Sequence, residues 1–194
     1  MTTKQKLLFI QNQVQDFDFF VTMGNGFVSK GIKVFTGARK NKDENGFFPT
    51  HAGHFRRNKE QVFPVDAQKD GYLQRDLFEW LSEYKYSILC FRKQFTTEEL
   101  EDLVQIERAL LGKEYDFESL LLRHPRKRVL EIAEKILNSD FDEWKEKDPK
   151  AEVKRIYCSE AESILLQFED SQLTPFEFMN KIKEEGFEVV FYLP

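Results

Sequence analysis

The sequence predicts an α+β fold in which a small, mainly antiparallel sheet packs against helices. Strand-like segments rich in aromatic residues dominate the first half, helical patterns dominate the middle, and one strand pattern closes the chain. Two short apolar segments are separated only by the charged turn "RRNKE", which is typical of an antiparallel hairpin. No internal repeat and no Gly-, Ser- or Pro-rich linker divides the 194 residues, so we expect a single domain over residues 1–194.

The expected strands combine β-branched or aromatic residues and are bounded by polar or glycine-containing turns. They cover residues 16–22, 50–55, 61–67, 86–93 and 187–193. Pro64 lies inside the third strand and restricts it to a sheet edge or a bulge, because proline has no backbone N–H to donate. Cys90 lies inside the apolar fourth strand, so we expect a core residue without a chemical role.

The expected helices show apolar residues at intervals of three and four, with capping or turn residues at their ends. They cover residues 74–84, 96–112 and 174–186, and one more helix begins at Cys158. The helix at 96–112 is the most clearly bounded, since Thr96 or Thr97 caps it and Gly112 ends it. Residues 23–41 combine a glycine turn with the pattern of a short helix.

The composition predicts a folded protein and excludes several classes of partner. Hydrophobic residues make up 41% of the chain and charged residues 32%, which supports a packed core. The net charge is −5, so nucleic acid is not an expected partner. Residues 7–10 are too short an apolar run for a signal peptide, and no run is long enough for a membrane helix. We therefore expect a cytoplasmic protein with free thiols, of open oligomeric state.

Cys158 lies where a short apolar run, "RIY", gives way to a predicted helix. A cysteine becomes a nucleophile as a thiolate, and a helix N-terminus or a nearby imidazole lowers its pKa. If the helix begins at Cys158, the first feature is present, and backbone N–H groups of that turn can also stabilise an oxyanion. Free cysteine is among the most buried residue types, so these features alone leave a packing role open.

Three histidines are available to supply the imidazole. His51 and His54 lie three apart on a predicted strand, so they should point to opposite faces, which also disfavours a shared metal site. His124 lies in the basic segment "RHPRKR" and is expected to be solvated. Antiparallel pairing brings Asp66, a lone acid in "VFPVDA", near His51, where its carboxylate would fix the imidazole tautomer. Capping a turn is the alternative role of Asp66.

Six segments follow one another along the chain and change this picture. They are "FDFFVTMGNGFVSKGIKVFTG" with "THAGHF", then "VDAQKDGY", "LGKEYDF", "YCSEAE" and "LTPFEF". In this order, with histidine before cysteine, they resemble the motifs of YiiX-like proteins. These form the circularly permuted, papain-fold branch of the NlpC superfamily of cysteine amidases and peptidases. The resemblance implies a circularly permuted papain-like (NlpC-type) core. The stretch between Tyr115 and Cys158 is long and charged, and we interpret residues 120–152 as a helical insertion that could cap the cleft.

The resemblance also implies a role for each matching residue. Cys158 matches the nucleophile and His51 matches the general base. Asp66 falls on the position of the orienting polar residue, and Tyr115 matches a tyrosine that lines the substrate site. A site of this kind needs no metal and no organic cofactor.

The chain departs from the family pattern at several positions. Asp66 stands where the family commonly has the longer Glu, and Glu114 replaces a proline. His54 replaces an aliphatic residue that usually follows the glycine of "THAGHF". Asp16 and Phe17 occupy a place where glycine is usual. These departures bear on the fine geometry of the site and on the shape of the substrate pocket.

The expected function is therefore a cysteine hydrolase that cleaves an amide or isopeptide bond, in a peptidoglycan-type peptide or an N-acyl amide. A first alternative keeps the site and makes the substrate a lipid acyl group, for hydrolysis or acyl transfer. A second alternative is a non-catalytic binding module. A narrow apolar tunnel would favour lipid, and a polar cleft ending at Tyr115 would favour a peptide. A Cys158 sulfur far from His51 would favour the binding module.

Overall fold

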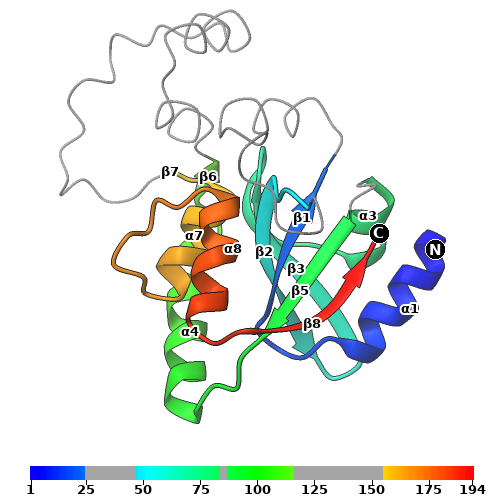
Figure 1. Ribbon diagram of the computed structural model, residues 1–194, viewed down its shortest axis with the longest axis horizontal. Coiled ribbons are helices and arrows are strands. Elements are labelled where there is room, and N and C mark those ends of the chain that lie inside the picture. The colour runs from blue at the N-terminus through cyan, green and yellow to red at the C-terminus, as the bar shows by residue number, and fades with distance from the viewer. Residues whose placement is uncertain (25–46, 84–86, 116–154) are drawn as a thin grey trace, which may run out of the picture.

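The protein is described by a computed structural model for residues 1–24, 47–83, 87–115 and 155–194 (Figure 1). Six antiparallel strands form one sheet in the order β4-β3-β2-β1-β5-β8. The α+β class and the antiparallel sheet predicted from the sequence are confirmed. The strands are β1 (Asp18–Met23), β2 (His51–Asn58), β3 (Gln61–Gln68), β4 (Gly71–Gln74), β5 (Ser87–Arg92) and β8 (Glu188–Leu193).

Helices cover both faces of this sheet (Figure 1). On one face lie α1 (Thr3–Gln13) and α3 (Leu77–Glu83); on the other lie α4 (Thr97–Leu110), α7 (Cys158–Leu165) and α8 (Pro175–Glu184). Thr96 and Thr174 cap α4 and α8 through capping boxes, each with a glutamate in the first turn. The helices predicted at these places from capping signals are confirmed.

The alternation of side chains along the strands divides the core into two layers. Phe19 and Phe91 point to the face of α7 and α8, where they are fully buried. Phe20 and Cys90 point to the opposite face and pack with Trp80 of α3. Cys90 is 0% exposed, as expected for a core cysteine. This two-residue period places neighbouring residues of one strand in different chemical environments.

The hairpin of β2 and β3 carries the candidate histidines and differs in detail from the prediction. Strand β2 runs through "RRN" to Asn58, and the turn narrows to Lys59, whose φ is 54°, and Glu60. Pro64 is not on an edge strand, since β3 lies between β2 and β4, and the register shows no bulge there. The carbonyl of Pro64 accepts from the Arg75 N–H just past the last β4 pair. The missing N–H of Pro64 therefore lies beyond the paired residues of β3 and β4, where the lack of a donor breaks no hydrogen bond of that pairing.

Several short or weakly patterned elements were not predicted. Helix α1 forms although "QNQ" interrupts its apolar run, because Thr2 and Gln5 build a capping box and Ile10 is buried. Strand β4 is only four residues long and follows directly after the turn at Lys69 and Asp70, so its pattern is too short to recognise. A further two-stranded parallel pair joins β6 (Glu114–Tyr115) to β7 (Arg155–Ile156).

Several predictions fall on residues outside the described ranges. They concern the helix pattern within residues 23–41, the insertion at 120–152 and the segment "RHPRKR" with His124. In the part of the chain that the structure describes, none of the helices has both the length and the apolar character needed to cross a bilayer.

Candidate active site

Cys158 is the first residue of α7, as predicted. The preceding Tyr157 is extended, and its N–H donates to the Glu160 carboxylate at 3.3 Å, which marks the start of the helix. The thiol is 0% exposed at the junction of α7 and β2. Backbone N–H groups of Ala52 and Ser159 hydrogen-bond to the sulfur. Both bonds favour the thiolate, because an N–H donor stabilises negative charge on its acceptor.

His51, the first residue of β2, contacts the thiol. Its imidazole hydrogen-bonds Cys158, and its Nε2 lies 2.9 Å from Asp66 Oδ2. With Nε2 engaged by the carboxylate, Nδ1 is the ring nitrogen left for the sulfur. The His51 side chain is 16% exposed, so the ring is the accessible member of the group. The large separation of Cys158 from His51 that would favour a binding module is not found.

Asp66 lies on β3, where it pairs with Gly53 of β2. Its side chain is fully buried and accepts from three groups besides His51: Arg75 Nε at 2.5 Å, Gln68 Nε2 at 2.8 Å and Trp80 Nε1 at 2.9 Å. Burial would raise the pKa of Asp66, but the bond and charge of His51 and the charge of Arg75 lower it to about 2. Asp66 therefore stays ionised at neutral pH.

The charges of Cys158 and His51 depend on each other. Burial opposes the thiolate, yet the cationic His51 and its hydrogen bond lower the pKa of Cys158 below the usual thiol value. Burial also opposes the imidazolium, but the thiolate and Asp66 raise the pKa of His51 to about 10. The geometry thus favours a thiolate–imidazolium pair held by a buried carboxylate.

Gly53 makes room for this arrangement. A Cβ on Gly53 would lie 2.5 Å from Phe20 Cζ, 2.7 Å from the Val65 oxygen and 3.0 Å from Asp66 Cβ. The Phe20 ring and the Asp66 side chain therefore both use the space that the missing side chain of Gly53 leaves.

Of the four predicted site residues, the structure brings Cys158, His51 and Asp66 together. The backbone of Tyr115 pairs with Ile156, two residues before Cys158, which places β6 beside the entry to α7. The Tyr115 side chain lies outside the described part of the structure.

A second polar group, which we call the His54 cluster (His54, Tyr72, Glu107 and Glu162), was not predicted. His54 is 0% exposed on the opposite face of β2. Its Nδ1 lies 2.9 Å from Glu162 Oε2 on α7, and its Nε2 lies 3.3 Å from Glu107 Oε1 on α4. The Tyr72 hydroxyl donates to Glu162 Oε1 at 3.2 Å. Arg56 pairs with the outer oxygen of Glu107.

The pKa values of His54, Glu107 and Glu162 in the His54 cluster are shifted from their ordinary values. Burial would lower the pKa of His54, but the carboxylates of Glu162 and Glu107 raise it to about 9. Burial raises the pKa of Glu162. For Glu107, burial is outweighed by His54 and Arg56, which lower its pKa. The sequence held a signal for this cluster, because Glu107 lies between Leu103 and Leu110 on the apolar face of α4.

Among residues 1–24, 47–83, 87–115 and 155–194, no group of three or more His, Cys, Asp and Glu side chains is arranged so that it could hold a metal ion.

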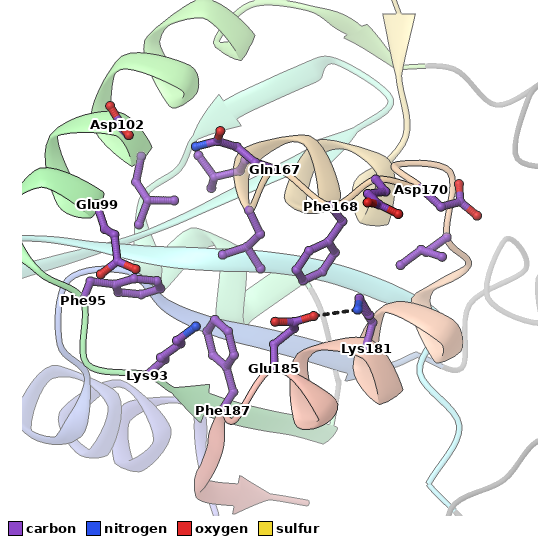
Figure 2. A pocket seen from close by; sticks show the side chains of 15 residues that line it. Lys93, Phe95, Glu99, Asp102, Gln167, Phe168, Asp170, Lys181, Glu185 and Phe187 are labelled. Atoms are coloured by element: carbon purple, nitrogen blue, oxygen red, sulfur yellow. Dashed lines mark hydrogen bonds and ion pairs between the residues drawn. The ribbon is translucent and has the colours of Figure 1, made fainter.

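A cavity of about 670 Å³ lies away from the thiol, at the C-terminal end of α7 (Figure 2). Phe95, Phe168 and Phe187 project toward it, and charged side chains such as Lys93 and Glu99 surround it (Figure 2). Because Cys158 is at the other end of α7, this cavity is not the substrate cleft. It therefore gives no support to an apolar acyl tunnel leading to the thiol.

The buried thiol of Cys158, the imidazole of His51 and the carboxylate of Asp66 thus form a candidate active site on an α+β scaffold. No protein-family model and no curated protein sequence matches the chain. Among solved structures, the chain is similar to the crystal structure of metalloprotein yiiX from Escherichia coli O157:H7, DUF1105, with 20% identity and a TM-score of 0.43, over 66% of this chain and 68% of that chain. The predicted likeness to a YiiX protein is confirmed. At this similarity it assigns no residue role, so the roles follow from the chain's own geometry.

Proposed function

We propose that the protein is a cysteine hydrolase that cleaves an amide or isopeptide bond through Cys158, His51 and Asp66. One observation carries the proposal: a buried thiol at a helix N-terminus is hydrogen-bonded to an imidazole that a buried carboxylate orients. This is the arrangement that nucleophilic catalysis requires, namely a nucleophile, a base within reach and a third group behind the base.

The reaction begins with the Cys158 thiolate attacking the amide carbonyl carbon. A C–S bond forms, the carbonyl π electrons move to oxygen, and the N-terminal turn of α7 stabilises that negative charge. The His51 imidazolium then gives its proton to the nitrogen as the C–N bond breaks, so the leaving group departs as a neutral amine. Neutral His51 next takes a proton from water, whose oxygen attacks the thioester. Collapse of that intermediate releases the acid and restores the thiolate–imidazolium pair.

Asp66 acts through His51 in this scheme. Its carboxylate fixes the ring with Nδ1 toward the sulfur and favours the charged imidazolium. Arg75 and Trp80 bind the same carboxylate and prevent it from turning away. The shorter side chain of Asp, compared with the Glu common in YiiX-like proteins, still reaches Nε2 at 2.9 Å.

The fold features support the finer assignment as well. His51 and Asp66 lie on a hairpin that precedes the cysteine helix in the chain, which fits a circularly permuted papain-like core. The contact between Cys158 and His51 favours catalysis over a binding module. Peptidoglycan-type peptides and N-acyl amides are the substrate class that the motif resemblance implies.

The proposal is tested with a panel of chromogenic substrates and intact-protein mass spectrometry. Acyl and aminoacyl p-nitroanilides probe amide cleavage, and a long-chain p-nitrophenyl ester probes lipid acyl transfer. Wild type is compared with Cys158→Ser, with Cys90→Ser as the matched control. We expect amide turnover and an acyl adduct in wild type and Cys90→Ser, and neither in Cys158→Ser. Turnover that survives Cys158→Ser would overturn the proposal, and turnover of the ester alone would replace amide cleavage by lipid chemistry.

A further inference from the structure

The two elements that carry the thiol and the imidazole are joined by a second polar contact. His54 follows His51 by three residues on β2, and Glu162 follows Cys158 by four residues, one helical turn, on α7. His51 contacts Cys158, and His54 contacts Glu162 at 2.9 Å. The same strand and the same helix are thus tied at two places.

We propose that the His54 cluster is a positioning device that holds α7 in register on β2 and keeps Cys158 within hydrogen-bond reach of His51. This inference rests on the proposed function, because it gives the cluster a task only if the Cys158–His51 pair is reactive. His54 and Glu162 are positioning residues in this proposal, since neither touches the thiol.

Directional contacts add to the apolar packing between the two elements. Ala52 of β2 and Ala161 of α7 are small, fully buried residues of the same core cluster. Burial of apolar surface is non-directional, and a small slide of α7 changes it little. A hydrogen bond between charged groups has a preferred length and angle, so the same slide breaks it.

The cluster is also complete enough to be rigid. Both ring nitrogens of His54 have carboxylate partners, and both oxygens of Glu162 have donors, His54 and the Tyr72 hydroxyl. Phe17 stacks on the His54 ring with centroids 5.3 Å apart and planes 16° apart. A fully satisfied buried network fixes the relative placement of the elements it joins.

The His54 cluster joins β2 and α7, which carry His51 and Cys158, to α4 and β4. Within the described residues, the charged and titratable groups around His54 are Glu162 on α7, Glu107 on α4, Tyr72 on β4 and Arg56 on β2. A buried ion pair is an inefficient source of stability compared with apolar residues of similar volume, so its retention is better explained by specificity of placement.

The test measures the pH dependence of iodoacetamide alkylation at Cys158 together with urea unfolding. The variant is Glu162→Met, which keeps length and volume but removes the bonds to His54 and Tyr72. The matched control is Leu165→Ala on the same helix, which weakens core packing and leaves the cluster intact. Tyr72→Phe removes one of the two donors to Glu162 together with the 3.4 Å contact between the Tyr72 hydroxyl and His54 Nδ1.

The sign of the effect separates position from charge. Removing the Glu162 anion would by its field alone lower the midpoint of Cys158 alkylation, since a nearby negative charge disfavours a thiolate. Loss of position raises the midpoint. We expect Glu162→Met to raise it by about one pH unit, which slows alkylation at pH 6 about tenfold. Tyr72→Phe should raise it less, and Leu165→Ala should leave it unchanged while lowering stability.

An unchanged or lower midpoint in folded Glu162→Met overturns the inference, as does an equal rise in Leu165→Ala. If Glu162→Met does not fold, the same sign criterion is applied to Tyr72→Phe, where a midpoint equal to wild type overturns it. Failure of the proposed function has a different signature: Cys158 of the wild type would then alkylate as an ordinary or inert thiol. In that case the wild type has no lowered midpoint, and the His54 cluster has no activated thiol to position.

Discussion

His51 and His54 lie three residues apart on the same strand and have opposite surroundings. His51 is 16% exposed at the start of β2, beside a thiol, with one carboxylate behind it. His54 is 0% exposed on the other face, between two carboxylates. The pKa of both is raised, to about 10 for His51 and about 9 for His54, against the opposing effect of burial.

A shifted pKa does not by itself identify a catalytic residue. Both histidines satisfy that criterion, and only His51 combines it with exposure and a nucleophile within hydrogen-bond reach. His54 has no path to a substrate among the described residues and instead connects β2, α4 and α7. We therefore propose that His51 takes part in the reaction and that His54 holds in place the strand and helix that carry the site.

The largest expected difference between the two histidines is in rate. His51→Asn removes the general base while leaving Asp66 with Arg75, Gln68 and Trp80. Amide turnover should fall by roughly 10²–10⁴-fold. Steady-state kinetics on the substrate found active in the panel measure this, and a decrease of less than tenfold would contradict the role of His51.

The free energy of unfolding should depend more on His54 than on His51, which is the reverse of the order expected for turnover. His54→Ala leaves Glu162 buried without its cation and Glu107 with Arg56 alone, and breaking a buried pair from one side costs about 3–5 kcal/mol. His51→Ala, at a partly exposed position, should lower the free energy of unfolding by about 1 kcal/mol. Urea denaturation at pH 7 gives both values. Equal losses for the two variants would remove the distinction between them.

The carboxylate behind His51 predicts a specific loss of stability in acid. The folded-state pKa of Asp66, about 2, lies below the ordinary value of 3.8, so its contribution is present above pH 4 and lost as pH falls toward 2. That contribution is on the order of 2 kcal/mol. Urea unfolding of wild type and Asp66→Asn from pH 5 to pH 2 should converge by this amount. Parallel curves would show that Asp66 is not held ionised.

The smallest expected effect is on stability and concerns Thr22 of β1, the strand that pairs with β2. Thr22 pairs with His51 across β1 and β2, and its buried hydroxyl has no hydrogen-bond partner in the described part of the structure. Replacing that hydroxyl by a methyl group in Thr22→Val should raise the free energy of unfolding by about 1 kcal/mol and leave turnover unchanged. A loss of turnover at unchanged stability would instead assign the hydroxyl to the site.

Local signals in the sequence explain which elements could be predicted. Helix α4 was predicted because a threonine cap, an acidic first turn, apolar spacing and Gly112 all lie within its own segment. Helix α1 was missed because its apolar run is short and part of its support is distant: Arg57 of β2 donates to the carbonyls of Gln11 and Val14 around its C-terminal end. A single-sequence pattern contains no information on that contact.

The candidate site divides in the same way. Hairpin pairing and a helix start are local features, so the proximity of Asp66 to His51 and the place of Cys158 on α7 could be predicted. Glu107 on the apolar face of α4 indicates a buried acid, but its partners could not be predicted, because His54, Glu107 and Glu162 come from three elements far apart in the sequence. Only the tertiary fold brings them together.

The most direct test of the central claim is the rate of iodoacetamide labelling at each cysteine as a function of pH, in wild type and His51→Ala. We expect Cys158 to react with a midpoint well below the free-thiol pKa of about 8.5. That midpoint should rise in His51→Ala, while Cys90, whose pKa burial raises, stays inert in both proteins. A Cys158 midpoint at the free-thiol value, or one unaffected by His51→Ala, would contradict the claim that these residues form an activated nucleophile.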